Sequence, residues 1–162
     1  MNVTLHEGDL LTSGCDIIAH QINRYGVFGG GIAAQIRAMY PKTAKKCRQF
    51  VLKTEEAGQE VYKKVFFYYE KGKEKSTIIA NCFSQEGFAT RQKWVRLCAR
   101  KVFEVAKAVS FFEKRHVRVG IPYNYGCGIA KGNWEIVEGE WRKVAEEYAD
   151  WDVELEIWRL DK

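Results

Sequence analysis

The sequence has few of the features that mark linkers, disordered tails or fibrous proteins. Only two prolines occur among its 162 residues, and it contains neither a low-complexity tract nor an internal repeat. Hydrophobic residues make up 46% of the chain and aromatic residues 14%. A chain of this length and composition can bury a core without disulfides or metals. We therefore expect one domain over residues 1–162.

Long hydrophobic runs are also missing. No stretch approaches the roughly 20 apolar residues that a membrane-spanning helix needs. The first ten residues, MNVTLHEGDL, alternate between apolar and polar side chains. They do not show the basic region and apolar run of a signal peptide. We expect a cytoplasmic protein that has no membrane partner.

The cysteines lack the spacing of a disulfide framework or a zinc site. There are five of them, widely spaced and without a Cys-x-x-Cys pair: Cys15, Cys47, Cys82, Cys98 and Cys127. An odd number at such spacings is typical of reduced thiols. No cluster of residues in the sequence requires a metal, and we expect no cofactor.

The formal net charge is +5, which raises the possibility of nucleic-acid binding. The basic residues are scattered among acidic ones, in segments such as KTAKKCRQF and ARKVFEVAK. This pattern favours solvated helix faces and loops. The resulting field also favours an anionic small ligand.

Strand and helix patterns alternate along the chain. β-Branched and aromatic runs predict strands at residues 3–6, 16–22, 61–69, 77–83, 117–122 and 153–160. Apolar periodicity of three and four predicts helices at residues 31–40, 42–56, 92–114 and 133–148. Such alternation indicates a sheet covered by helices on both faces. We expect an α/β fold, a three-layer α/β/α sandwich with a mixed, mostly parallel six-stranded sheet.

Two glycine-rich loops follow expected strands. The first is HQINRYGVFGGG, which leads into a helix, and the second is PYNYGCGIAKGN. In open α/β sheets ligands bind at the carboxyl ends of the strands. Glycines that open a helix present backbone N–H donors to a phosphate, so two such loops predict a diphosphate ligand. Tight turns and close packing are the alternative explanation. Neither the P-loop nor the Rossmann spacing is present.

Five segments in order, GDLL, CDIIAHQIN, GVFGGGIA, IANCFSQ and IPYNYGCGIAKGNWE, resemble the macrodomain family of ADP-ribose-binding modules. The resemblance runs from Gly8 to Trp158. It looks closest to the branch of terminal ADP-ribose protein glycohydrolases and compact bacterial and phage proteins. It implies the macrodomain fold, and ADP-ribose or an ADP-ribosylated protein or nucleic acid as the partner.

The resemblance also implies roles for individual residues. Asp16 would accept from the adenine amino group beside the Ile17 backbone, although an aspartate before a strand is often a turn residue. Trp158 would pack against the adenine, with core packing as the alternative. The first phosphate loop would comprise Gly29, Gly30, Gly31 and Ile32. The second would comprise Tyr125, Gly126, Cys127, Gly128 and Ile129.

Catalytic candidates are fewer. The resemblance places Asn23 beside the distal ribose. His20 lies on the preceding strand, where a buried structural histidine is favoured over a catalytic one, and Gln85 lies in the loop that could order a water. The aspartate that follows Gly-Cys-Gly-Leu in the terminal glycohydrolases is replaced by Ala130, and no lysine matches theirs.

We therefore expect a protein that binds ADP-ribose and processes it. The expected reaction is removal of ADP-ribose from a macromolecule or dephosphorylation of ADP-ribose 1″-phosphate. A non-catalytic ADP-ribose-binding module is the main alternative, and a nucleic-acid-binding domain is a third. The sequence leaves the oligomeric state open, and we favour a monomer.

Overall fold

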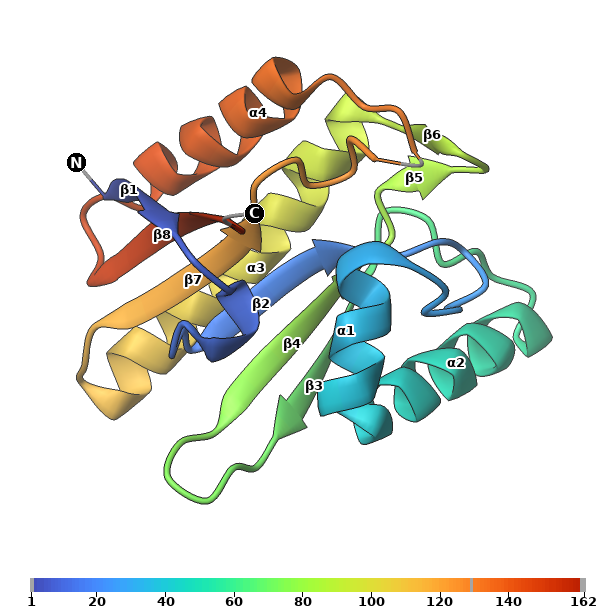
Figure 1. Ribbon diagram of the computed structural model, residues 1–162, viewed down its shortest axis with the longest axis horizontal. Helices are drawn as coiled ribbons and strands as arrows, with labels where there is room; N and C mark the ends of the chain where they lie inside the picture. The colour runs from blue at the N-terminus through green and yellow to red at the C-terminus, as the bar shows by residue number, and fades with distance from the viewer. Residues whose placement is uncertain (1, 129, 161–162) are drawn as a thin grey trace.

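The computed structural model describes residues 2–128 and 130–160 (Figure 1). Six strands form one sheet in the order β1-β8-β7-β2-β4-β3. All neighbours pair in parallel except β3, which is antiparallel to β4. Their bounds are β1 (Val3–Glu7), β2 (Ile17–Gln21), β3 (Val65–Glu70), β4 (Thr77–Cys82), β7 (Val117–Pro122) and β8 (Val153–Arg159). The mixed, mostly parallel six-stranded sheet is confirmed.

Four α-helices connect the strands: α1 (Gly31–Met39), α2 (Pro41–Glu56), α3 (Gln92–Glu113) and α4 (Trp134–Glu147). All four match the helices expected from apolar periodicity. Two short elements were not expected: the 3-10 helix η1 (Leu10–Thr12), and a hairpin of β5 (Gln85–Glu86) and β6 (Ala89–Thr90). The expected third strand was too long at its start, because a turn closed by Lys64 N–H donating to Val61 C=O at 3.0 Å precedes Val65.

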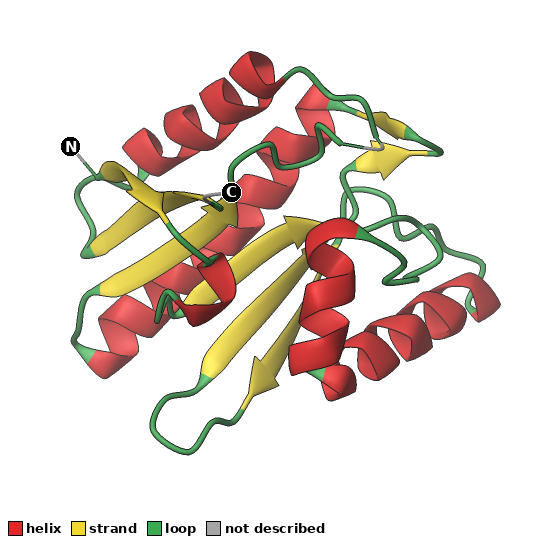
Figure 2. Cartoon of the chain, in the orientation of Figure 1, coloured by secondary structure: helices red, strands yellow, loops and turns green. Residues whose placement is uncertain are grey.

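Helices cover both faces of the sheet (Figure 2). Strand β2 shows why, because successive side chains point to opposite faces. Ile17 and Ala19 belong to the core formed with α3 and α4. Ile18 and Ile22 belong to the second core, under α1 and α2. The expected three-layer α/β/α arrangement is confirmed.

Local sequence signals set the ends of α3 and α4. The side chain of Asn133 caps α4 by accepting from the N–H groups of Glu135 and Ile136. Helix α3 ends where Lys114 adopts a left-handed conformation, with φ of 52°. These two helices pack beside each other over the sheet and fix the loops that enter and leave β7.

A buried carboxylate joins α3 to α4. Glu140 on α4 is 1% exposed. Its carboxylate accepts from the guanidinium of Arg96, including Nη2 at 3.0 Å, and from Gln92 Nε2 at 3.0 Å. The bonds from Arg96 lower the pKa of Glu140, so it is ionised and paired at neutral pH. Two turns later, the Glu147–Arg100 pair joins the same helices at the exposed surface.

None of the described helices combines the length and apolar character needed to cross a bilayer. The five cysteines are all free thiols, and four of them are buried.

We predict that Glu140→Ala lowers the free energy of unfolding by about 2–3 kcal/mol, because it removes the carboxylate that pairs the Arg96 charge between two helices. Urea denaturation measures this value. Glu147→Ala is the matched control, since it removes a solvent-screened pair between the same helices, and its effect should be a small fraction of that loss. Equal losses for the two variants would contradict the prediction.

Candidate functional site

The carboxyl ends of the parallel strands meet at one edge of the sheet, and three loops gather there (Figure 1). They are the segment between β2 and α1, the β5–β6 hairpin after β4, and the segment between β7 and α4. Strand β2 pairs with β4 along its whole length but with β7 only at Ile17 and Ile18. The carboxyl ends of β2 and β7 are therefore unpaired with each other. The chain also turns to opposite faces after these two strands, which is the topology where α/β sheets bind ligands.

The first glycine loop ends in the N-terminus of α1. Gly30 is the N-cap, and no side chain caps the helix. The first turn of α1 contains no acidic residue. The first backbone N–H groups of a helix have no partner within it, and the helix dipole adds a partial positive charge there. The first turn, from Gly31 to Ala33, thus presents donors suited to an anion.

The glycines of these loops fall into two groups. A Cβ at Gly26 would lie 2.9 Å from Val51 Cγ2, and one at Gly126 would lie 2.9 Å from Thr90 Oγ1, so packing requires glycine at both positions. A Cβ added at Gly29 or Gly128 would meet nothing within 4 Å. Neither of these two residues has the positive φ that favours glycine. The fold itself therefore does not explain Gly29 and Gly128.

A polar network holds the second glycine loop. Gln21, the last residue of β2, donates from Nε2 to Thr90 Oγ1 at 2.9 Å, and Thr90 Oγ1 donates to Gly126 C=O at 2.6 Å. Ser84 Oγ donates to Gln21 Oε1 at 2.6 Å and accepts from the Tyr125 hydroxyl at 2.7 Å. The network joins β2, the hairpin and the second loop. Sequence reasoning missed Gln21, Ser84 and Thr90, because nothing in their spacing predicts this contact.

The side chains of the second loop are tied into the protein. Tyr125 is 1% exposed and packs edge-on against Trp141, with ring centroids 5.4 Å apart. The phenol of Tyr125 belongs to the buried core, so only the backbone of this residue is placed to contact a ligand. Cys127 Sγ donates to Tyr125 C=O at 3.1 Å, and burial raises the pKa of the thiol. Ile129 lies outside the described residues.

Asp16 and Ile17 lie at the amino edge of the sheet, opposite the edge where the glycine loops gather. Asp16 precedes β2, so about five residues of strand, roughly 16 Å, separate it from the glycine loops. Its carboxylate accepts from Arg118 N–H at 2.7 Å and pairs with Arg115 at 2.8 Å and Lys75 at 3.2 Å. Burial opposes this ionisation, but the three partners lower the pKa of Asp16. Ile17 is fully buried in the core, so neither residue meets the loops.

A different carboxylate lies at the carboxyl edge, near Trp158. Asp9 follows β1, and its Oδ1 accepts from Leu11 N–H at 2.9 Å. The neighbouring Gly8 has φ of +135°, and a Cβ there would lie 3.1 Å from the Trp158 ring. Trp158 stacks on His6 with centroids 4.7 Å apart. The signal available in the sequence was Gly8-Asp9 directly after the first strand.

A buried acid fixes the Trp158 indole. Glu156 Oε1 accepts from Trp158 Nε1 at 2.9 Å and from Cys15 Sγ at 3.3 Å. Arg118 donates to both carboxylate oxygens, at 2.6 and 2.8 Å. Burial alone would raise the pKa of Glu156, but these hydrogen bonds outweigh it and bring the pKa to about 2.

His20 is buried beneath the first glycine loop. It is 0% exposed, and its Nε2 donates to Asn81 Oδ1 at 2.7 Å. Its Nδ1 has no partner among the described residues. Burial lowers the pKa of His20 to about 4, so the ring is neutral at pH 7. The ring packs beside Phe28 of the first loop, with centroids 5.6 Å apart.

Asn23 and Gln85 also make internal hydrogen bonds. Asn23 closes its own loop, because Nδ2 donates to Val27 C=O at 2.8 Å and Oδ1 accepts from Tyr25 N–H at 3.0 Å. Gln85 Oε1 accepts from Gln21 at 3.0 Å, and its Nε2 donates to Gly87 C=O at 2.8 Å. Both residues lie at the carboxyl edge, as expected, and both shape loops.

A cavity of about 320 Å³ lies elsewhere, at the C-terminal end of α3, and is lined by Glu104, Lys107, Ala108, Phe111, Phe112 and Trp151. Helix α3 begins after the hairpin at the carboxyl edge and ends just before β7 starts, so the cavity at its C-terminal end lies at the amino edge, remote from the glycine loops. Among the described residues, no three His, Cys, Asp or Glu side chains group as a metal site.

The burial of His20 predicts a specific pH dependence of the free energy of unfolding. Its folded pKa, about 4, lies below the ordinary value of 6.5, so the unfolded chain binds a proton first as pH falls. The stabilisation from neutral burial is therefore complete above about pH 6.5 and is lost toward pH 4. Between pH 7 and pH 5 the loss from this residue should be roughly 2 kcal/mol.

Urea denaturation of the native chain and of His20→Asn at both pH values isolates this contribution, because the other groups titrate alike in the two proteins. The stability difference between them should shrink at pH 5. An unchanged difference would contradict a neutral, buried His20.

No protein-family sequence model and no curated protein sequence matches the chain. Solved structures do. The macrodomain of Mycobacterium tuberculosis DarG is 20% identical, with a TM-score of 0.76 and coverage of 96% of each chain. Thermosipho africanus DarTG in complex with ADP-ribose is 17% identical with a TM-score of 0.76, and the match covers 98% of this chain and 41% of that one.

A Trypanosoma brucei macrodomain in complex with ADP-ribose is 17% identical with a TM-score of 0.71, and the match covers 99% of this chain and 64% of that one. Proteins from three organisms thus share this fold over nearly the whole of this chain. The chain has the macrodomain fold.

Proposed function

We propose that the protein binds ADP-ribose, free or attached to a macromolecule, at the carboxyl edge of its sheet. The observation that carries this proposal is the open space beside Gly29 and Gly128. Both lie in loops at the topological switch point between β2 and β7. A ligand that approaches the backbone closely would explain why glycine occurs at these two positions, which packing does not explain.

The diphosphate belongs between the two loops, where the uncapped N-terminus of α1 supplies N–H donors. The adenine belongs at the end of the site formed by Asp9 and Trp158. Asp9 takes the part first expected of Asp16, because Asp9 lies at this edge and keeps one carboxylate oxygen beyond the Leu11 contact. The distal ribose then falls toward Asn23 and the β5–β6 hairpin.

Two structural neighbours support this choice of ligand. The Thermosipho africanus DarTG and Trypanosoma brucei macrodomain structures are complexes with ADP-ribose. Both align over nearly all of this chain.

Processing of ADP-ribose, either its removal from a macromolecule or the dephosphorylation of ADP-ribose 1″-phosphate, is the second candidate. Asn23 lies near enough to the proposed ribose position to keep this prediction open. Its amide is bound within its own loop, however, and Gln85 is held in the polar network. Glu86, the nearby acid, pairs with Arg91 at 2.6 Å. The geometry therefore favours binding over turnover.

Filling the open glycines should separate ligand binding from stability. Gly29→Ala and Gly128→Ala add a Cβ where no protein atom lies, so the free energy of unfolding should change by no more than about 0.5 kcal/mol. Each should weaken ADP-ribose binding by about tenfold or more, because the methyl occupies ligand space. Titration calorimetry with ADP-ribose measures the affinity.

Gly139→Ala is the control, because this glycine also faces open space but lies within α4, away from the loops. It should leave the affinity unchanged. Unchanged affinity in both loop variants, or no binding by the native chain at millimolar ADP-ribose, would contradict the proposal. Mass spectrometry of the same samples reports any turnover. Intact ligand after long incubation would support binding without processing.

The two aspartates should behave differently. Asp9→Asn keeps an oxygen that caps η1 but removes the charge offered to the adenine amino group, so ADP-ribose affinity should fall by about tenfold. Asp16→Asn should lower the free energy of unfolding, because it leaves Arg115 and Lys75 without their partner, and affinity should stay near that of the native chain. Calorimetry and urea denaturation on both variants test this. The reverse pattern would return the adenine to Asp16.

A further inference from the structure

Strand β3 forms one edge of the sheet, and its sequence is unusual for an edge. Residues 65–69 read VFFYY and contain neither a charge nor a proline. Native proteins commonly protect edge strands with lysines, prolines or bulges inside the strand. Here the charges lie just outside it, at Lys63 and Lys64 before the run and at Glu70 and Lys71 after it.

The register of β3 on β4 shows which backbone groups face outward. Phe83 N–H donates to Lys64 C=O at 3.0 Å, so Lys64 faces β4. Backbone direction alternates along a strand, so Phe66, Tyr68 and Glu70 also face β4. The N–H and C=O groups of Val65, Phe67 and Tyr69 therefore point away from the sheet. Among the described residues these groups have no hydrogen-bond partner.

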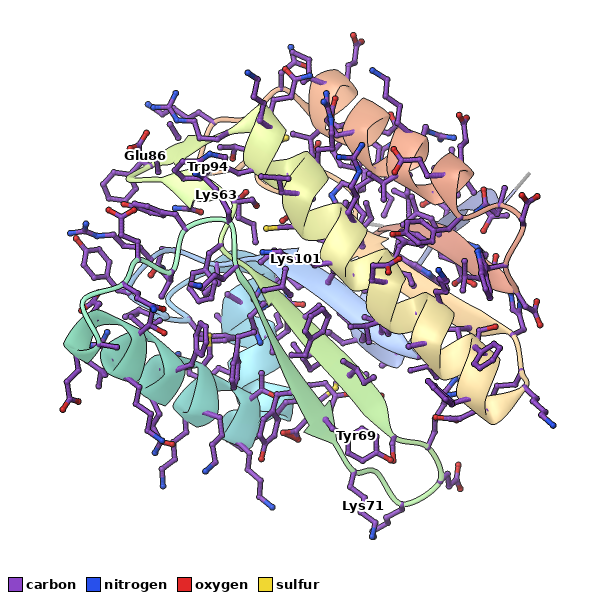
Figure 3. The ribbon with its side chains drawn as sticks, turned by 180° about the vertical axis from the view of Figure 1, so that it is seen from behind. Lys63, Tyr69, Lys71, Glu86, Trp94 and Lys101 are labelled. Atoms are coloured by element: carbon purple, nitrogen blue, oxygen red, sulfur yellow. The ribbon has the colours of Figure 1, made fainter. Side chains whose placement is uncertain are left out.

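This edge is accessible. Figure 3 views the molecule from the back and shows β3 between α2 and α3, with Lys63 near one end and Tyr69 and Lys71 near the other. Tyr69 is 62% exposed. The strand thus offers an apolar, hydrogen-bonding edge of six residues.

We propose that a second copy of this chain pairs with β3, edge to edge and antiparallel, about a two-fold axis at Phe67. An outward-facing residue can pair only with another outward-facing residue, so one strand can slide along the other only by two residues at a time. Each such slide moves the two-fold axis by one residue. The register centred on Phe67 uses the whole strand. It places Val65 opposite the partner copy's Tyr69, and Phe67 opposite itself.

Charge complementarity selects this register and this occupant. Centring on Phe67 places Lys64 of each copy opposite Glu70 of the other, which forms two symmetric ion pairs at the ends of the paired segment. The next position would set Lys63 opposite Lys71, but Lys63 lies in the turn before β3 with φ of 69°, so the paired segment ends at Lys64. Shifting the centre by one residue in either direction sets Lys64 opposite Tyr68, or Glu70 opposite Phe66, and breaks both pairs. A strand whose ends complement themselves fits a copy of itself.

The other edge of the sheet lacks this property. Self-pairing of β1 about Leu5 would set Val3 opposite Glu7 and Thr4 opposite His6. No pair of opposite charges forms in that register, so β3 is the self-complementary edge.

The dimer would leave the glycine loops free. An axis perpendicular to the sheet joins the two copies into one continuous sheet, and each set of loops stays at the carboxyl edge of its own parallel strands. The inference therefore stands independently of the ligand. A six-residue edge contact is a small interface, so we expect weak association with a dissociation constant in the micromolar range.

Sedimentation velocity of the full chain, from low micromolar to submillimolar concentration, tests the proposal. The native chain should shift from monomer to twice the monomer mass. Lys64→Glu and Glu70→Lys should each weaken association by about tenfold, because each sets like charges face to face. The double swap should restore it, since the ion pairs re-form with reversed sign.

Lys143→Glu is the control, because it makes the same charge change at an exposed position of α4, which packs against α3 and β8 at the opposite end of the sheet from β3, and it should leave association near native strength. Tyr69→Pro provides a second variant, since it removes an outward N–H that the β4 pairing does not use, and it should abolish association while circular dichroism stays native. A native chain that remains monomeric throughout, or a double swap that stays monomeric, would overturn the proposal.

Discussion

Parallel pairing of the central strands is the constraint on which the rest of the structure depends. β2, β4 and β7 run in the same direction, so the chain must cross the sheet between them, and the crossovers are the helices that cover both faces. Most of their side chains are then buried, which explains runs such as Ile17–Ala19 and the two separate cores. Parallel pairing also sends the loop after every strand of the sheet except β3 to one edge.

The two edges of the sheet differ in chemistry as a result. At the amino edge, Asp16 gathers Arg118 N–H, Arg115 and Lys75, and these contacts close the ends of β2 and β7 together. At the carboxyl edge, β2 and β7 are unpaired with each other, and Gln21 bonds Thr90 of the hairpin, which in turn bonds the second glycine loop at Gly126. The amino edge is stabilised by charge, whereas the carboxyl edge keeps backbone donors and open glycines available for a ligand.

Two buried polar groups restrict where side chains lie beneath the carboxyl edge. His20 is neutral because burial disfavours its charged form, and Glu156 is ionised because Arg118, Trp158 and Cys15 surround its carboxylate. A buried polar group without such partners would cost free energy, so each one restricts where its neighbours lie. Glu156 restricts the Trp158 indole, and His20 lies against the loop at Phe28. Side chains held in place in this way suit recognition of a ligand.

Local patterns in the sequence determined the elements and their order. Apolar periodicity placed α3 and α4 to within a residue at most of their ends, and β-branched runs placed all six strands of the sheet, because these signals arise from which side chains each element must bury. They also determined that the glycine loops follow strands. The hairpin at β5–β6 was not visible, because its strands are two residues long and carry no apolar pattern.

Tertiary structure alone decided which residues meet. An aspartate before a strand and one after a strand look equally suited to a ligand in sequence, but Asp16 and Asp9 lie at opposite edges because strand direction separates them. Gly126 and Gly128 look alike, yet a Cβ at the first would clash with Thr90, whereas one at the second would meet no described residue. Such contacts join segments far apart in the chain, and a linear pattern carries no record of the distance between them.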